Sequence, residues 1–248
     1  MKQIDYDGRT LQVPEALEEL TPQQYLRYLE IALMLQAGQI KPVQARVKLL
    51  TLLLQLPVDA AMMPRSQCKK LAALVTLTDP FVQKREGVVR LDTCTGMNLL
   101  PQWQRRKGPG DMLNGISFGA FIRCSGWLAG MNALEGEERE EAVARVAGEL
   151  YPGEGRLPVL VQTHACLFFL NVLEILRTEP LEMNGCTVDY RILFQENPKK
   201  APAKGPSVGW TGVAMDLAEL GVFGTYQQVL DAPMWDVFTF LYHKQRQG

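Results

Sequence analysis

The chain has 248 residues, 47% of them hydrophobic, and its 26 basic side chains are balanced by 27 acidic ones. This length suffices for one large domain or two small ones with a substantial core. A net charge of −1 gives no overall attraction to nucleic acid or to an anionic membrane, so neither is predicted as a partner. The five cysteines are scattered and form no C-x-x-C pair, which favours reduced thiols in a cytoplasmic protein.

The N-terminal residues predict a β-hairpin over 2–13. QIDY and TLQV are short strand-forming runs, and Asp7-Gly8 between them suits a tight turn. The first residues lack the apolar run of a secretory signal, so no leader is expected.

A helix is predicted over 22–37, where the local signals are the clearest in the chain. Thr21 and Gln24 form a T-x-x-Q capping box, Pro22 suits the first helical position, and the apolar residues that follow recur at helical spacing. Further helices are predicted at 42–56 and 65–77. The leucines of 42–56 lie almost all round the helix, which indicates deep burial or a partner on the far side.

The rest of the chain alternates between helical patterns and turn-rich segments. Strands or a hairpin are predicted at 87–103, and a loop at RRKGPGDMLNG. A second hairpin is predicted at 180–194, around Asn184-Gly185. Helices are predicted over SFGAFIRCSGWLAGMN with Ser117 as its cap, and over 137–151, 158–177, 210–220, 225–230 and 233–245.

The predicted fold is therefore mainly α, a helical bundle-like body with small β-hairpins near the N-terminus, at 87–103 and at 180–194. The body is predicted to cover 1–195, and the Pro- and Lys-rich segment 196–208 is predicted to be a linker. Residues 209–248 would form a C-terminal helical unit, which is small enough that it should dock on the body. The apolar run 157–176 contains four strongly polar residues, so it is predicted to be a buried helix and not a membrane span.

Catalytic and metal-binding patterns are weak. Residues 115–119 match G-x-S-x-G, the nucleophile-elbow pattern of α/β-hydrolases, and both histidines, His164 and His243, follow Ser117. However, no buried strand precedes Ser117, and a helix cap explains the same residue. The histidines have no metal-ligand spacing. No catalytic residue, metal or cofactor is predicted, and the chain is expected not to be an enzyme.

Apolar surface is the remaining functional signal. Two aromatic-rich runs flank a Gly-Val-Phe-Gly turn in 217–242, and the last helix carries apolar side chains on more than one face. These side chains either pack wholly within the chain or form an aromatic hot spot for a partner. The predicted partner-binding residues are Trp210, Val222, Phe223, Trp235, Phe238, Leu241 and Tyr242.

Several segments resemble the tail-assembly proteins that tailed bacteriophages and prophages encode near the tape-measure gene, particularly in Bacteroidetes-type hosts. They are ELTPQQY (19–25), NLLP (98–101), Asp111 with Phe118 and Phe121, Asn184-Gly185 followed by Phe194, and Gly209-Trp210 with AExGVFG (218–224). The resemblance implies a helical chaperone that keeps the long tape-measure protein soluble while the tail tube grows around it. It implies no catalytic residue.

The function predicted from these signals is a non-enzymatic, chaperone-like tail-assembly protein of the bacterial host cytoplasm. Its partner would be a tape-measure-like helical protein or another tail protein, and self-association is a further partner hypothesis. Because such chaperones are often shorter, the alternative is a structural virion component, such as a tail-completion or baseplate protein. A serine hydrolase using Ser117 is the third hypothesis.

Overall fold

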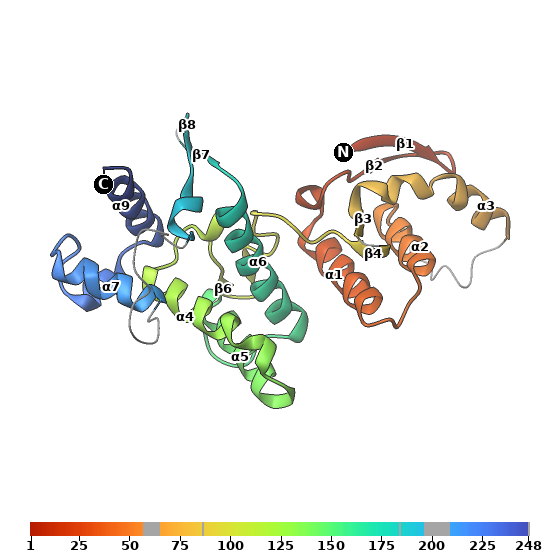
Figure 1. Cartoon of the computed structure of the whole chain (residues 1–248). Coiled ribbons are helices and arrows are strands. Elements are labelled where there is room, and N and C mark those ends of the chain that lie inside the picture. Colours follow the sequence, from red (N-terminus) through yellow and green to blue (C-terminus); the bar gives the residue numbers. More distant parts are fainter. Residues whose placement is uncertain (57–64, 86, 184, 196–208, 248) are drawn as a thin grey trace. The chain divides into compact units, whose positions relative to one another are not determined.

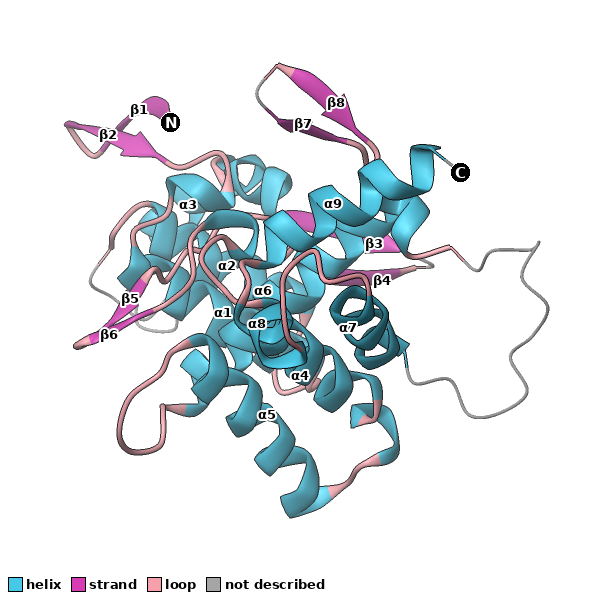
Figure 2. Cartoon of the chain, turned by 90° about the vertical axis from the view of Figure 1, so that its left-hand side faces the viewer, coloured by secondary structure: helices cyan, strands magenta, loops and turns pink. Residues whose placement is uncertain are grey.

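The computed structural model describes residues 1–56, 65–85, 87–183, 185–195 and 209–247 (Figure 1). Within these ranges the chain is mainly α-helical with small hairpins, as predicted, and its strands form four separate two-stranded antiparallel sheets (Figure 2). The chain divides into two compact units, Met1–Thr95 and Gly96–Gly248. This boundary lies inside the segment 1–195 that the sequence assigned to one body, because no Pro- or Gly-rich linker marks it. The predicted linker 196–208 lies outside the described residues.

The first unit begins with the predicted N-terminal hairpin. Strand β1 (Lys2–Tyr6) pairs with β2 (Arg9–Val13). Both turn residues have a positive φ, 51° at Asp7 and 76° at Gly8. A two-residue turn of this kind matches the right-handed twist of the two strands, and the predicted turn at Asp7-Gly8 is confirmed.

Helix α1 (Pro22–Gln36) starts and ends where the sequence indicates. The Thr21 side chain accepts the backbone N–H of Gln24, whose side chain accepts that of Thr21, which completes the capping box. On the buried face, the Tyr28 hydroxyl donates to the backbone carbonyls of Phe81 and Asp92 and so ties the helix to the end of the unit. The remaining elements are η1 (Leu17–Glu19), α2 (Pro42–Leu53), α3 (Arg65–Ala73) and η3 (Val75–Phe81).

The hairpin predicted at 87–103 is wrong in its pairing. Strand β4 (Val88–Leu91) pairs with the preceding strand β3 (Val82–Arg85), and not with the residues that follow it. Gly87, at φ 79°, lies in the turn between the two strands. The later part of the segment, β5 (Gln102–Trp103), pairs with β6 (Arg106–Lys107), which was expected to be loop. The predicted strands therefore belong to two hairpins in different units.

The second unit is built around helix α4 (Phe118–Ala129), which packs against α5 (Gly136–Leu150), α8 (Tyr226–Asp231) and α9 (Met234–Gln247). Helix α6 (Val159–Thr178) packs against α5, and its Phe169 also contacts Phe121 of α4; α7 (Gly209–Glu219) packs on α8. The shorter elements are η4 (Asp111–Leu113), η5 (Met131–Ala133), β7 (Leu181–Met183), β8 (Cys186–Val188) and η6 (Tyr190–Leu193).

The C-terminal helices are joined to the start of α4 by main-chain hydrogen bonds. Phe118 N–H donates to the carbonyl of Ala232 at 2.8 Å, and Met234 N–H donates to that of Ile116 at 3.1 Å. Gly119 allows this close approach, because a Cβ there would lie 3.0 Å from the carbonyl oxygen of Leu230. Residues 209–247 thus belong to the core of the second unit and share one hydrophobic cluster with α4 and α6.

Helix α6 is long and apolar enough to cross a membrane by length and composition alone. Its side chains explain that composition differently, because 56% of the most apolar window is buried inside the unit. Gln162 and His164 are among the buried residues, and both are hydrogen-bonded. The buried residues of α6 form part of the hydrophobic core of the second unit.

Candidate protein-binding surface

Much of the aromatic content of the C-terminal segment is used inside the second unit. The Trp210 ring stacks on Phe238 with a centroid separation of 5.5 Å, and meets Phe121 edge-on at 5.3 Å. Phe194 reaches the same cluster, 5.4 Å from Trp210. Because these rings come from α4, α7, α9 and the residue that follows η6, the cluster holds the C-terminal helices against the rest of the unit.

Phe238 was predicted to contact a partner, and this assignment is wrong. Its side chain is 0% exposed and packs against Phe121 at a centroid separation of 5.0 Å. Met234, Val237 and Phe238 form the inward stripe of α9, at the i, i+3 and i+4 spacing of a buried helix face. The sequence shows apolar residues on several faces of this helix, but it does not show which face meets α4.

The other predicted residues of α9 are half-buried. Trp235 donates its indole N–H to the carbonyl of Met112 at 3.1 Å, and its ring lies 5.5 Å from that of Tyr190. The Tyr242 ring also packs on that of Tyr190, at a centroid separation of 5.5 Å. Leu241, the residue before Tyr242, is half-buried. These side chains each keep part of their surface exposed, while one side of each is fixed by the unit.

Several exposed apolar side chains are grouped around the turn between α7 and α8. Leu220 is 51% exposed and Val222 is 48% exposed, whereas Phe223 is half-buried against Phe240 at a centroid separation of 5.7 Å. Met215 and Tyr226 are exposed on the flanking helices. We call Met215, Leu220, Val222 and Tyr226 the α7–α8 apolar turn. Of these residues the sequence analysis named only Val222, although all four flank or lie in the Gly-Val-Phe-Gly turn that it singled out.

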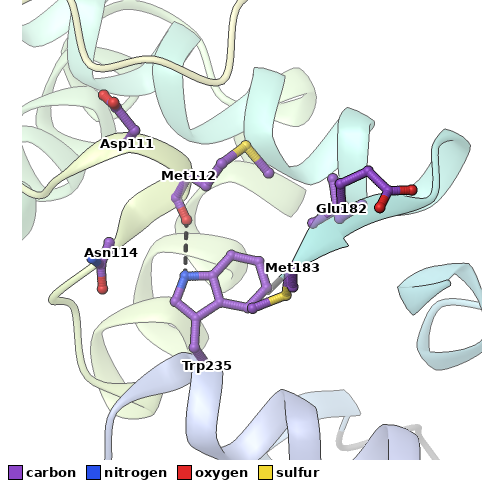
Figure 3. Close-up of a pocket in the computed structure, with 7 residues that line it drawn as sticks. Asp111, Met112, Asn114, Glu182, Met183 and Trp235 are labelled. Atoms are coloured by element: carbon purple, nitrogen blue, oxygen red, sulfur yellow. Dashed lines mark hydrogen bonds between the residues drawn. The ribbon is translucent and has the colours of Figure 1, made fainter. Parts of the chain in front are cut away.

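A pocket of about 360 Å³ lies beside Trp235 (Figure 3). It is bounded by the loop before α4, by the β7–β8 hairpin and by the first turn of α9. We call it the Trp235 pocket; its lining residues are Asp111, Met112, Asn114, Leu181, Glu182, Met183 and Trp235. Only Trp235 was predicted as a functional residue, because the others come from segments that are brought together only by the fold.

A buried polar network holds the loop that forms one wall of this pocket. The Asn98 side chain accepts the N–H of Leu100 at 3.0 Å and donates to the carbonyl of Pro109 at 2.7 Å. The His164 Nε2 atom lies 3.0 Å from Asn98 Oδ1 and 3.1 Å from the Tyr151 hydroxyl oxygen. Burial lowers the pKa of His164 to about 4 and raises that of the Tyr151 hydroxyl. Both groups are therefore neutral near pH 7, and their hydrogen bonds to Asn98 help to hold the loop in place.

The G-x-S-x-G match has a structural explanation at each position. Gly115 has a φ of 90°, Ser117 accepts the N–H of Ala120 at 3.1 Å as the cap of α4, and Gly119 contacts Leu230 closely. The predicted cap is thus confirmed. All described strand pairs are antiparallel hairpins, whereas a nucleophile elbow leaves a parallel sheet. In the described part of the chain, no three His, Cys, Asp or Glu side chains are grouped to hold a metal ion.

Comparison with known proteins gives no relative: no family model, no curated protein and no solved structure matches the chain. The functional interpretation therefore depends on the site geometry together with the sequence resemblance described above.

Proposed function

We propose that this chain is a non-enzymatic tail-assembly protein of a tailed bacteriophage or prophage, which acts as a chaperone in the host cytoplasm. Its partner would be a long helical protein of the tape-measure type. The observation that carries the proposal is the α7–α8 apolar turn, where four apolar side chains within twelve residues are exposed. Exposed apolar side chains grouped in this way are typical of protein-binding surfaces.

In this proposal the helices of the second unit form a bundle-like body that presents the turn. An amphipathic partner helix commonly binds by placing its apolar face against such a surface, with anchors at i, i+3, i+4 and i+7. The turn would bind one apolar stripe of the partner and so keep it from aggregating. The near-neutral charge of the chain is consistent with recognition through apolar contact.

The test is co-expression with the tape-measure protein of the same phage or prophage, followed by affinity purification. The double variant Leu220→Ser/Val222→Ser should reduce binding at least about tenfold, which corresponds to about 1.4 kcal/mol. The matched control is Val159→Ser, because Val159 is 72% exposed in the same unit but lies at the start of α6. The control should bind normally.

Unchanged binding by a correctly folded double variant would overturn the role of the turn. Mass spectrometry of purified particles then separates the chaperone from the alternative. A chaperone should be absent from finished particles, whereas a tail-completion or baseplate component should be present in a fixed ratio to the other tail proteins.

A further inference from the structure

The α7–α8 apolar turn lies in an acidic segment of the chain. Residues 209–242 contain four acidic residues but no lysine or arginine. Two of the acids, Asp216 and Glu219, lie in the last turn of α7. Their neighbours in the chain, Met215 and Leu220, belong to the apolar turn. Because the chain as a whole is close to neutral, the negative charge is a local property of this surface.

The two carboxylates share one face of α7 with two of the exposed apolar side chains. Met215, Asp216 and Glu219 are exposed on the helix. Leu220 follows the helix and is exposed too, and its N–H donates to the carbonyl of Asp216 at 3.1 Å, which continues the helical pattern. At about 100° of rotation per residue, these four side chains lie within roughly 140° of the helix surface, and the buried Ala214 lies on the opposite side. A partner that contacts the apolar side chains therefore also approaches both carboxylates.

The charge of these two carboxylates is not balanced by an ion pair in the part of the chain that the structure describes. Neither Asp216 nor Glu219 takes part in a salt bridge there. In the last turn of α7, their charge adds to the partial negative charge of the helix C-terminus, where acidic side chains are unfavourable and cations are favoured. The two acids therefore do not stabilise the free helix, but they would attract a cation that a partner brings.

The turn that presents these side chains is held in one conformation. Gly221 follows α7 and, at φ 69°, has the left-handed conformation common at helix C-termini. Thr225 and Gln228 form the capping box of α8. Between these two ends, Phe223 packs on Phe240 of α9. A surface that is already ordered loses little conformational entropy when a partner binds.

We propose that the α7–α8 apolar turn binds a basic amphipathic helix, in which lysines or arginines border the apolar stripe. The stripe covers the apolar side chains of the turn, and the bordering cations meet Asp216 and Glu219. The ring of Tyr226, exposed in the first turn of α8, offers a cation a further contact. This inference rests on the proposed function and adds the charge of the helical partner.

The same charge disfavours two other occupants of the turn. A second copy of this chain that binds through the same surface brings its own Asp216 and Glu219 to the contact, and like charges oppose that pairing. An anionic membrane surface is repelled by the two carboxylates for the same reason.

The test uses the full-length protein and three synthetic, fluorescently labelled peptides of about 18 residues, which is roughly five helical turns. All three carry leucines at the same i, i+3, i+4 and i+7 positions, and the positions that border this stripe are lysine, glutamine or glutamate. Fluorescence anisotropy measures binding. The lysine peptide should bind with a micromolar Kd, the glutamine peptide at least about tenfold more weakly, and the glutamate peptide not at all. Raising the salt concentration from about 50 mM to about 500 mM should weaken the binding of the lysine peptide.

Variants locate the charge. Asp216→Asn/Glu219→Gln should bind the lysine peptide at least about fivefold more weakly and leave the affinity for the glutamine peptide unchanged. The matched control is Glu137→Gln/Glu138→Gln, which removes the same charge from exposed positions in the first turn of α5. This control should bind the peptides as the original protein does.

Three results would overturn the proposal: equal affinity for the lysine and glutamine peptides, no binding of any peptide, or an equal loss in the control. Leu220→Ser/Val222→Ser should lose the lysine peptide, and retained binding would place the peptide on another surface, which also overturns it. Sedimentation that shows a dimer lost in this variant would instead assign the turn to a second copy.

The proposed function is tested separately, by affinity purification with the tape-measure protein. If that binding depends on Leu220 and Val222 but is unchanged in Asp216→Asn/Glu219→Gln, the proposed function stands and only the charge of the partner helix is wrong.

Discussion

The C-terminal helices contain two apolar regions of similar composition and opposite exposure. Around Phe238, rings from α4, α7 and the residue after η6 pack on the ring of Phe238, and its side chain is 0% exposed. Around Val222, the apolar residues stand at a turn and remain about half exposed. The comparison shows that aromatic and aliphatic richness alone does not identify a binding surface. The exposed region is where packing within the unit ends, and there a partner can replace water.

The sharpest test of this difference is Phe238→Ala, which should produce the largest loss of stability. Removing a fully buried phenylalanine typically costs about 3–5 kcal/mol, because a cavity remains where the ring was. For a unit of this size the melting temperature should fall by roughly 10 °C. Chemical denaturation followed by circular dichroism measures the effect. A loss below about 1 kcal/mol would show that the aromatic cluster is not the core of this region.

The buried interior of the second unit also contains a titratable group, His164. Its pKa is about 4 in the folded state because of burial, against 6.5 for an ordinary histidine, so the unfolded chain binds the proton more tightly. Stability should be unaffected above pH 6.5, fall as the pH drops from 6.5 to 4, and reach a total loss of about 3 kcal/mol from this group.

Urea denaturation at a series of pH values measures this dependence. His164→Gln is the control, because glutamine can still donate to Asn98 but does not titrate. The variant should have a shallower pH dependence between pH 6.5 and 4.5. Equal slopes for the two proteins would contradict the assignment of this loss to His164.

A smaller effect is expected at the junction between α4 and the C-terminal helices. Ser117→Ala removes the side-chain cap of α4 and should cost about 1 kcal/mol, whereas Ser117→Asp should retain most of the stability. Thr21→Ala, which removes the cap of α1, is the matched change in the first unit. If Ser117→Ala has the same free energy of unfolding as the original protein, the side chain of Ser117 does not stabilise α4 as a cap.

The smallest effect on stability is expected at the exposed turn. Leu220→Ser and Val222→Ser should each change the free energy of unfolding by no more than about 0.5 kcal/mol, since little of their burial is lost. Thermal unfolding of the single variants measures it. A loss above about 2 kcal/mol would mean that these side chains are part of the core, which would remove the distinction from Phe238.

Local signals predicted the helices well because each depends on neighbouring residues. The capping box at Thr21, the cap at Ser117 and the Asp7-Gly8 turn all act within a few positions. The sequence did not predict features that depend on distant partners. Packing between distant segments determines three of these features, and no local pattern encodes it. They are the pairing of 88–91 with 82–85, the boundary at Thr95 and the inward face of α9.

The candidate site divides in the same way. Val222 could be found because it lies in a turn between apolar runs, and Trp235 because it is an aromatic residue on the last helix. The rest of the Trp235 pocket could not be found, because the loop at 111–114, the hairpin at 181–183 and α9 are far apart in the sequence. Likewise, the bonds of His164 to Asn98 and Tyr151 span 66 and 13 residues.

The hydrogen bond from Trp235 to Met112 has a consequence for the timing of biosynthesis. The two residues are 123 positions apart, and the indole belongs to the last helix. The loop at Met112, whose φ of 53° lies in the left-handed region, therefore gains this restraint only after the residues up to Trp235 have left the ribosome. The wall of the Trp235 pocket that Met112 forms therefore gains this restraint late in the synthesis of the chain.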